Sequence, residues 1–171
     1  MDVAVDSAGN AVVLGDRGLP DFSYFLAKLS PLGELIFLRE LEMPSRAPSA
    51  VALDPAGYIY IAGTQSYSGE CCVGSEANTG FVAKLGPDGT GLFYDTVFSE
   101  GANTQAHDIA VDALGRAHVH FTSDGGENYL SLGVNFSPAG SIQGYFGFAA
   151  APYSYVTAMA LGPSGDLFTV G

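Results

Sequence analysis

Short runs of apolar residues recur along the chain, and each run ends at a tight turn. The first run is Val3 to Val5, followed by Asp6 and, three residues later, by Gly9. The same order of aliphatic, Ala, aliphatic, Asp and then Gly returns in residues 51–57 and 109–115, and a weaker copy occupies residues 159–165. Because the copies lie roughly 50 residues apart, they predict a chain built from repeats of one supersecondary unit.

The residues around each turn predict a β-hairpin. An Asp that opens a tight turn accepts a hydrogen bond from the backbone two residues on, and the Gly adopts the positive φ that the turn requires. β-Branched and aromatic residues follow the Gly and predict a second strand over residues 10–15, 58–64, 116–122 and 166–171. Capping of the turn is therefore the favoured role of Asp6, Asp54 and Asp112, and calcium ligation is the alternative.

A second pair of strands completes each repeat. Phe25 to Lys28 and Phe81 to Lys84 share the order Phe, aliphatic, Ala, Lys, and a Pro-x-Gly turn follows both. Fourth strands are predicted over residues 35–41, 92–98 and 142–149. Helical periodicity is absent, so the chain is predicted to be all-β, a β-propeller arc of four-stranded antiparallel blades. Three full blades are expected over residues 1–47, 48–105 and 106–154, and half of a fourth over residues 155–171.

These motifs resemble the SBBP-type β-propeller repeat of bacterial proteins, which is related to the NHL-type repeat. The likeness lies in the Asp-x-x-Gly turn, the strand Phe81-Val-Ala-Lys-Leu and the following Pro-x-Gly turn, and it extends at blade spacing over the whole chain. Asn135 replaces the Lys in the third copy, and Gly162 replaces the Asp in the fourth. The resemblance implies a larger propeller of six to eight blades and an extracellular or cell-surface parent protein, and it implies no catalytic motif.

Composition narrows the range of partners. The chain has 18 acidic and 6 basic residues and a formal net charge of −12, which argues against nucleic-acid binding and against docking on anionic membranes. No apolar run in the sequence is long enough to span a membrane. The N-terminal residues 1–4 do not have the pattern of a signal peptide. The chain is expected to be a segment of a longer propeller, an open arc whose partners are the remaining blades or an associating chain.

The irregular loops between blades predict a binding face, because variable loops on a rigid scaffold commonly carry function. A carbohydrate or protein ligand would suit the polar and aromatic side chains there, although an ordinary solvated surface has the same composition. The candidate ligand-binding residues are Tyr67, Glu70, Glu76, Asn103, Gln105, Asp124, Glu127, Tyr153 and Tyr155.

Two carboxylates occupy one repeat position near the predicted channel mouth. Asp2 and Asp108 hold the position that Ala50 and Ala158 hold in the other two copies. Carboxylate oxygens suit a hard cation such as calcium, but a water-filled channel also accommodates them without a ligand. Asp2 and Asp108 are the weak metal candidates, and the expectation is that the chain needs no cofactor.

Histidine and cysteine suggest weaker metal sites. His118 and His120 alternate on one predicted strand, and His107 begins its neighbour. Three imidazoles would suit zinc, although His118 occupies a packing position that Tyr60 holds in the second copy. Cys71 and Cys72 are adjacent and predict an exposed pair without metal, either as free thiols or as a vicinal disulfide.

Two functions fit the sequence. The first is a non-catalytic extracellular module that binds or scaffolds, favoured because the channel positions lack a convergent charged cluster. The second is a propeller-type hydrolase or lyase with a cation or acid/base site at the channel mouth. Known hydrolase signatures, such as Gly-x-Ser-x-Gly and His-Glu-x-x-His, are missing from the sequence.

Overall fold

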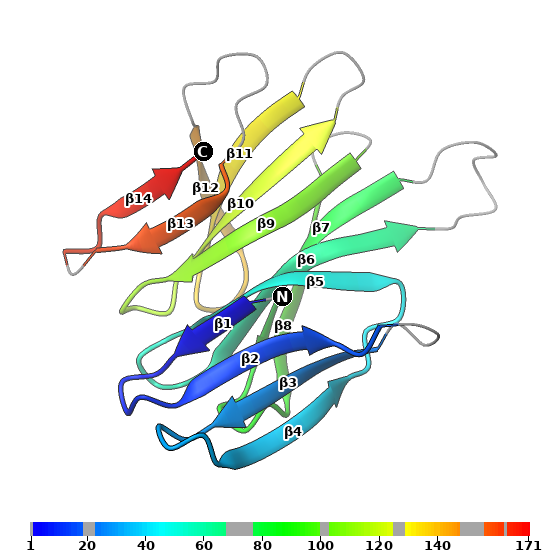
Figure 1. Cartoon of the computed structure of the whole chain (residues 1–171). Helices are drawn as coiled ribbons and strands as arrows, with labels where there is room; N and C mark the ends of the chain where they lie inside the picture. Colours follow the sequence, from blue (N-terminus) through cyan, green and yellow to red (C-terminus); the bar gives the residue numbers. More distant parts are fainter. Residues whose placement is uncertain are drawn as a thin grey trace.

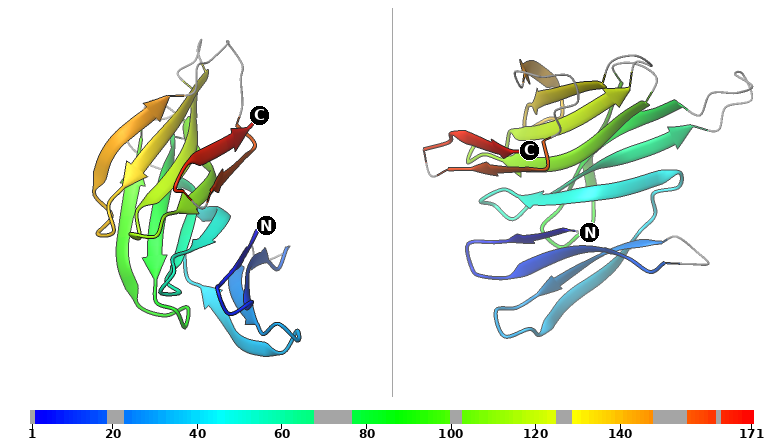
Figure 2. Two further views of the ribbon diagram at one scale, coloured as in Figure 1. Left: turned by 90° about the vertical axis from the view of Figure 1, so that its left-hand side faces the viewer. Right: turned by 45° about the horizontal axis from the view of Figure 1, so that its top comes forward.

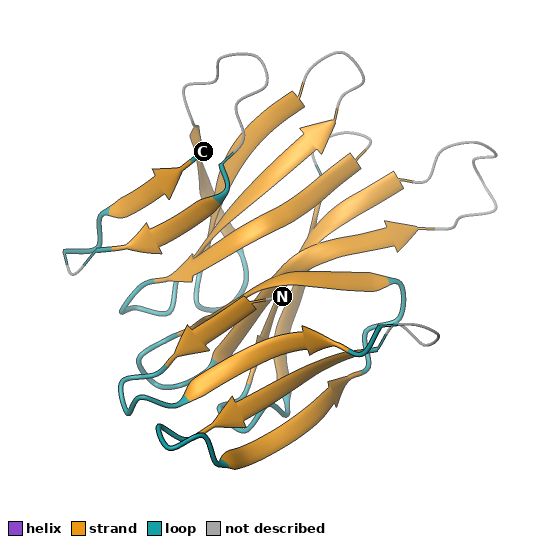
Figure 3. Cartoon of the chain, in the orientation of Figure 1, coloured by secondary structure: helices purple, strands orange, loops and turns teal. Residues whose placement is uncertain are grey.

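The computed structural model describes residues 2–18, 23–67, 77–99, 103–124, 129–147, 156–162 and 164–171. Every regular element in these ranges is a β-strand, and Figures 1 and 3 show strands joined by loops and turns. The all-β prediction is confirmed for this part of the chain. Among the same residues, none forms a helix of the length and hydropathy that crossing a membrane requires.

The first repeat forms a four-stranded antiparallel sheet in which neighbours in sequence are neighbours in space. The order is β1-β2-β3-β4, and we call this sheet the first unit. Alternation of side chains along each strand gives it two apolar faces. Its strands are β1 (Asp2–Val5), β2 (Ala11–Asp16), β3 (Tyr24–Leu29) and β4 (Leu35–Leu41).

The second and third units repeat this order. A single parallel pairing of Asn78 with Asn103 joins them into one hydrogen-bonded sheet, and a separate hairpin follows. The second unit comprises β5 (Arg46–Leu53), β6 (Ile59–Tyr67), β7 (Ala77–Leu85) and β8 (Leu92–Phe98). The third comprises β9 (Asn103–Val111), β10 (Ala117–Asp124), β11 (Tyr129–Phe136) and β12 (Ile142–Gly147), and the hairpin comprises β13 (Ala158–Leu161) and β14 (Leu167–Val170).

The units follow one another around an arc. β1 lies beside β5, β5 beside β9 and β9 beside β13, so the first strand of each unit faces the inner side of the arc. In Figure 2 the first unit and the β13–β14 hairpin stand at the two ends. Each unit therefore packs on its neighbours through its faces.

The irregular loops predicted between blades are partly strand. β5 begins at Arg46 and β9 begins at Asn103. Both strands contain a β-bulge, at Ser49 in β5 and at His107 in β9. A bulge inserts an unpaired residue and interrupts the alternation, so the apolar pattern identified only the part of each strand that follows it.

The predicted turn caps are confirmed. Asp6 Oδ1 accepts hydrogen bonds from the backbone N–H of Ala8 and of Asn10, at 3.0 and 2.9 Å. Asp54 and Asp112 cap their turns in the same way. The Gly of each turn has φ between 75° and 85°, as at Gly115 and Gly165, and only Gly tolerates this conformation without strain.

Acid should weaken the fold through Asp6. Hydrogen bonds from the Asn10 side chain and the ammonium of Lys28, 2.9 Å away, hold the pKa of the Asp6 carboxyl well below its ordinary value. A carboxyl with a depressed folded-state pKa contributes stability above its unfolded pKa and loses it as the pH falls. Urea unfolding between about pH 5 and about pH 2 should therefore show a steeper loss of stability for the wild type than for Asp6→Asn. Equal slopes would contradict this role of Asp6.

Apolar contact between units forms two cores. The first joins the first and second units and includes Leu14, Leu26, Ile61 and Phe81. The second joins the second and third units and includes Tyr60, Val82, Phe121 and Phe136. Because both faces of the second unit are covered in this way, its strands are apolar at consecutive positions, which agrees with the sequence pattern.

Candidate functional site

The two carboxylates predicted at one repeat position do occupy equivalent places. Asp2 accepts the N–H of Val3 in its own strand and that of Val51 in β5, both at 2.8 Å. Asp108 accepts the N–H of Ile109 at 2.8 Å and also that of Met159 in β13. Each carboxylate therefore joins its own inner strand to the next one, a structural role that the sequence did not reveal.

Asp108 has a perturbed acidity. Burial is the main cause that raises the pKa of its carboxyl above the ordinary value, and the negative charge of Asp2 adds to the effect. The two backbone hydrogen bonds act in the opposite direction and offset only part of it. A half-buried carboxyl that holds a proton more tightly than usual is typical of acid/base sites.

A hydroxyl replaces the carboxylate at the junction between Asp2 and Asp108. In β5 the repeat position of Asp2 and Asp108 is held by Ala50, whose side chain cannot accept a hydrogen bond. The hydroxyl of the preceding residue, Ser49, donates instead to the carbonyl oxygen of Ala106 at 2.7 Å. This bond joins β5 to β9. Inner strands are thus connected by a side chain at all three junctions, and at two of them the side chain is an acid.

The three histidines do not converge on one point. His107 and His120 lie with ring centroids 5.5 Å apart, whereas His118 bonds Asn135 through Nδ1 at 2.6 Å. His120 is fully buried, its Nε2 lies 2.8 Å from the Ser131 hydroxyl, and burial lowers its pKa to about 4. Its imidazole is therefore neutral near pH 7. Within the described ranges no three His, Cys, Asp or Glu residues are grouped as a metal site would require.

A buried polar network lies where the second unit meets the third. Lys84 Nζ donates to the Tyr60 hydroxyl at 2.6 Å and lies 3.6 Å from a carboxylate oxygen of Asp54. The Tyr60 hydroxyl lies 3.1 Å both from that oxygen and from the carbonyl oxygen of Gly115 in the next unit. Burial and the Asp54 charge raise the pKa of Tyr60 far above its ordinary value, so the hydroxyl stays protonated.

This network explains two repeat positions that the sequence left without a role. The conserved order Phe-x-Ala-Lys places Lys28 beside Asp6 in the first unit as it places Lys84 beside Asp54. In the third unit Asn135 stands at the Lys position and bonds His118. The acidic turn and the basic third strand are therefore coupled in the first and second units, and the sequence signal was the Asp-to-Lys order that these two repeats share.

The candidate ligand-binding residues predicted in the loops between blades do not form one described surface. Asn103 and Gln105 lie in β9, and Tyr67 and Asp124 end β6 and β10, so these four are on strands and the prediction of loops was wrong for them. For Asn103 and Gln105 the reason is that β9 extends beyond its bulge at His107. The other five candidates, Glu70, Glu76, Glu127, Tyr153 and Tyr155, lie outside the described residues. Cys71 and Cys72 also lie outside them.

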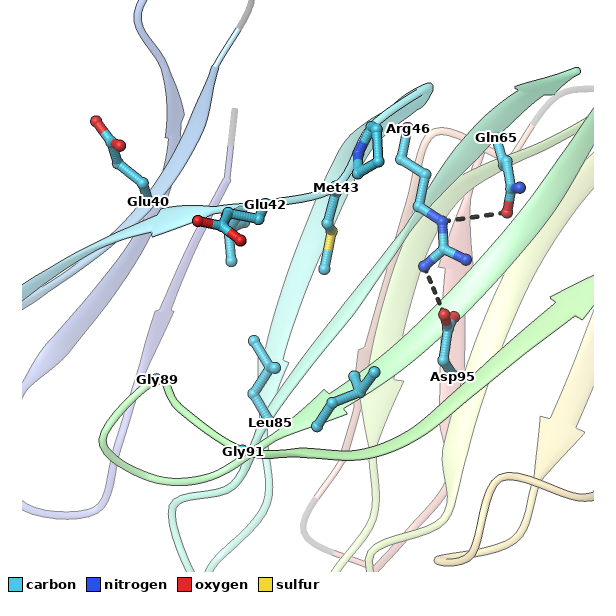
Figure 4. A pocket seen from close by; sticks show the side chains of 12 residues that line it. Glu40, Glu42, Met43, Arg46, Gln65, Leu85, Gly89, Gly91 and Asp95 are labelled. Carbon is cyan, nitrogen blue, oxygen red and sulfur yellow. Dashed lines mark hydrogen bonds and ion pairs between the residues drawn. The ribbon is translucent and has the colours of Figure 1, made fainter. Parts of the chain in front are cut away.

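A groove of about 700 Å³ lies between the first and second units and was not predicted. Figure 4 shows Arg46 between two partners: it donates to the Gln65 side-chain oxygen at 3.1 Å and pairs with Asp95 at 2.7 Å. The Arg46 guanidinium also lies over the Phe81 ring, 4.8 Å from its centroid. Arg46, Gln65 and Asp95 are therefore paired with one another and stabilise the wall of the groove that the second unit supplies.

Comparison with known proteins reveals a similar fold among the solved structures. No protein-family model and no curated protein sequence matches the chain, so membership of the SBBP-type repeat family stays a prediction. Among solved structures, a gluconolactonase from Xanthomonas campestris, described as important in glucose secondary metabolic pathways, aligns with a TM-score of 0.55 and 17% identity. The alignment covers 99% of this chain and 53% of that structure.

This similarity corrects the predicted function and supports the predicted fold. The prediction of a non-catalytic binding module is corrected, because a solved structure that shares the fold is an enzyme. The chain spans about half the length of that structure. At this identity the comparison establishes the fold, and the chain has the antiparallel, propeller-like architecture of a known gluconolactonase.

Proposed function

We propose that this chain is part of a β-propeller hydrolase that opens lactones or related esters. The observation that carries the proposal is the half-buried Asp108 carboxyl on the inner side of the arc, because burial and the charge of Asp2 raise its pKa as an acid/base role would require. The fold shared with a gluconolactonase supports the choice of substrate class. The finer architecture, three blades and half of a fourth within a ring of six to eight, belongs to the same proposal.

The chemistry needs few groups. Ionised Asp108 accepts a proton from a water molecule as the water oxygen attacks the carbonyl carbon of the lactone. The bond between that carbon and the ring oxygen then breaks, and the departing oxygen takes up the proton, which leaves a hydroxy acid. A hard cation held by free lone pairs of Asp2 and Asp108 would polarise the same carbonyl. An extracellular location of the parent protein, implied by the repeat resemblance, is a further prediction.

Hydrolysis of D-glucono-δ-lactone should depend on Asp108. Proton release measured at constant, mildly acidic pH should exceed the uncatalysed rate, and Asp108→Asn should lower the catalysed rate about 100-fold, since general-base catalysis typically contributes this much. The matched control is Asp88→Asn, because Asp88 is an exposed turn carboxylate that bonds its near neighbour Thr90. Thermal unfolding of each variant shows whether the fold persists.

Two further arms make this test decisive. Asp2→Asn should reduce the rate by a smaller factor, because Asp2 acts on the carboxyl of Asp108 through its charge. Chelation with EDTA followed by addition of Ca²⁺ separates a cation-dependent rate from a purely acid/base one. A folded Asp108→Asn variant with the wild-type rate would exclude this site, and a wild type that does not accelerate lactone or ester hydrolysis would exclude the function.

A further inference from the structure

The groove between the first and second units has the size of a small-molecule site. Its volume is about 700 Å³, and ligand pockets of proteins usually measure about 300–1,000 Å³. The end of β4 and the linker to β5 form one side, and the β7–β8 hairpin forms the other. Both units have all four strands, so both walls are present in full. Because β8 pairs only with β7, at the outer edge of its unit, the groove lies far from the inner strand that carries Asp108.

Apolar side chains form the floor of the groove. Leu85 is 7% exposed and belongs to the core between the two units, and Met43 packs against that core. Figure 4 shows the Met43 side chain pointing down toward Leu85. Leu92 is 58% exposed, and the turn residues Gly89 and Gly91 have no side chains to fill the space. The floor therefore offers apolar contact to a ligand, and the Met43 thioether favours an aromatic ring.

The basic group of the groove is already neutralised. The Arg46 guanidinium pairs with Asp95 at 2.7 Å and donates to the Gln65 side chain at 3.1 Å, and its flat face lies over the Phe81 ring. Because Asp95 matches the charge of Arg46, this end of the groove gives little attraction to an anionic ligand.

Glu42 supplies a negative charge that is not matched. It lines the groove from the linker between β4 and β5, and within the described ranges no basic side chain forms an ion pair with it. Glu40, the other acid on this side, pairs with Arg17. The whole chain carries a formal net charge of −12, which adds to the negative potential around Glu42. The groove therefore complements a cation.

We propose that this groove binds an arylalkylamine, a small organic cation with an aromatic body. The ammonium group donates charge-assisted hydrogen bonds to the Glu42 carboxylate, and the aromatic body lies against Met43, Leu85 and Leu92. Because the ligand contacts both units, binding stabilises their junction and raises the midpoint of thermal unfolding. This site is separate from Asp108 and does not depend on the proposed hydrolase activity.

Three probes that share one apolar body and differ in charge test the proposal. They are 4-phenylbutylamine, 4-phenylbutanol and 4-phenylbutyrate, each titrated into the isotope-labelled chain while backbone NMR shifts report affinity and place of binding. The amine should bind about tenfold more tightly than the alcohol, since a hydrogen bond to a charged group contributes at least that factor. The carboxylate should bind most weakly. Shifts should change in the β4–β5 linker and in the β7–β8 turn.

Two variants separate the charge from the apolar contact. Glu42→Gln should weaken binding of the amine about tenfold and leave binding of the alcohol unchanged, whereas Leu92→Ser should weaken both. Both side chains are exposed, so the fold should persist, and thermal unfolding without ligand checks this. Glu34→Gln is the matched control, because Glu34 is an exposed acid at the opposite end of β4 and does not line the groove.

Several results would overturn the proposal. Equal affinity of the wild type for the amine and the alcohol would remove the role of charge. Equal loss of amine binding in Glu42→Gln and Glu34→Gln would show attraction by the overall charge of the chain in place of a site. Absence of amine binding at millimolar concentration, or shift changes confined to other surfaces, would exclude the groove. None of these readouts involves lactone hydrolysis.

Discussion

Replacing Phe121 with Ala should lower the free energy of unfolding by about 3–5 kcal/mol, the usual cost of deleting a buried aromatic ring. Phe121 is fully buried in the core between the second and third units. Its ring centroid lies 4.8 Å from that of Phe98 and 6.4 Å from that of Phe136. It also lies against Gly80, where an added Cβ would come within 2.3 Å of the ring. Neighbours on both units therefore depend on this one side chain.

The cavity left by Phe121→Ala cannot close easily, because rigid strands from two units surround it. Urea unfolding followed by circular dichroism gives the change in free energy. Phe93→Ala is the matched control, since Phe93 is 60% exposed and its loss should cost less than about 1 kcal/mol. Similar costs for the two variants would contradict the inference that the Phe121 ring stabilises the core between the second and third units.

Replacing Asp54 with Ala should cost about 3–5 kcal/mol, because it leaves a buried ammonium without its counter-charge. Asp54 and Lys84 are each 8% exposed. The variant loses the hydrogen bonds that the carboxylate accepts from the backbone of Ala56 and Tyr58, both at 3.0 Å. It also loses the acceptor that faces the Tyr60 hydroxyl. The remaining contacts of Lys84 Nζ are then the Tyr60 hydroxyl and two aromatic rings.

Asp112→Ala separates the cost of the turn from the cost of the buried charge. Asp112 caps an equivalent turn through Leu114 and Arg116, but the Arg116 side chain is 47% exposed and water solvates it. This variant should lose about 1–2 kcal/mol, the value of the hydrogen bonds alone. Thermal or urea unfolding of both variants gives the comparison. If Asp54→Ala cost no more than Asp112→Ala, the ion pair with Lys84 would contribute nothing to stability.

The repeat pattern predicted much of the local structure correctly. Residues 35–41 and 92–98 were predicted as strands and are β4 and β8 with the same bounds. Asp6, Asp54 and Asp112 were predicted as turn caps, and each accepts the expected backbone hydrogen bonds. These features depend on residues within one turn or one strand, so the sequence contains all the information that they need.

The candidate site was predicted only in part. The sequence placed Asp2 and Asp108 at equivalent positions, which the structure confirms. It did not predict that each carboxylate binds the backbone of the next inner strand, because those partners lie 49 and 51 residues away along the chain. Distances between repeats are set by packing of whole sheets, and no local pattern encodes them.

The sequence by itself determined the repeat, the all-β class and the turns, because alternation of side chains and the φ requirement of Gly act over a few residues. Only the tertiary structure decided which groups meet across units. It brought Tyr60 to the carbonyl of Gly115 and brought Asp108 under the influence of Asp2. It also extended β5 and β9 through bulges at Ser49 and His107. The physical reason is that contact between faces removes water and charge screening, and this happens only when complete units pack together.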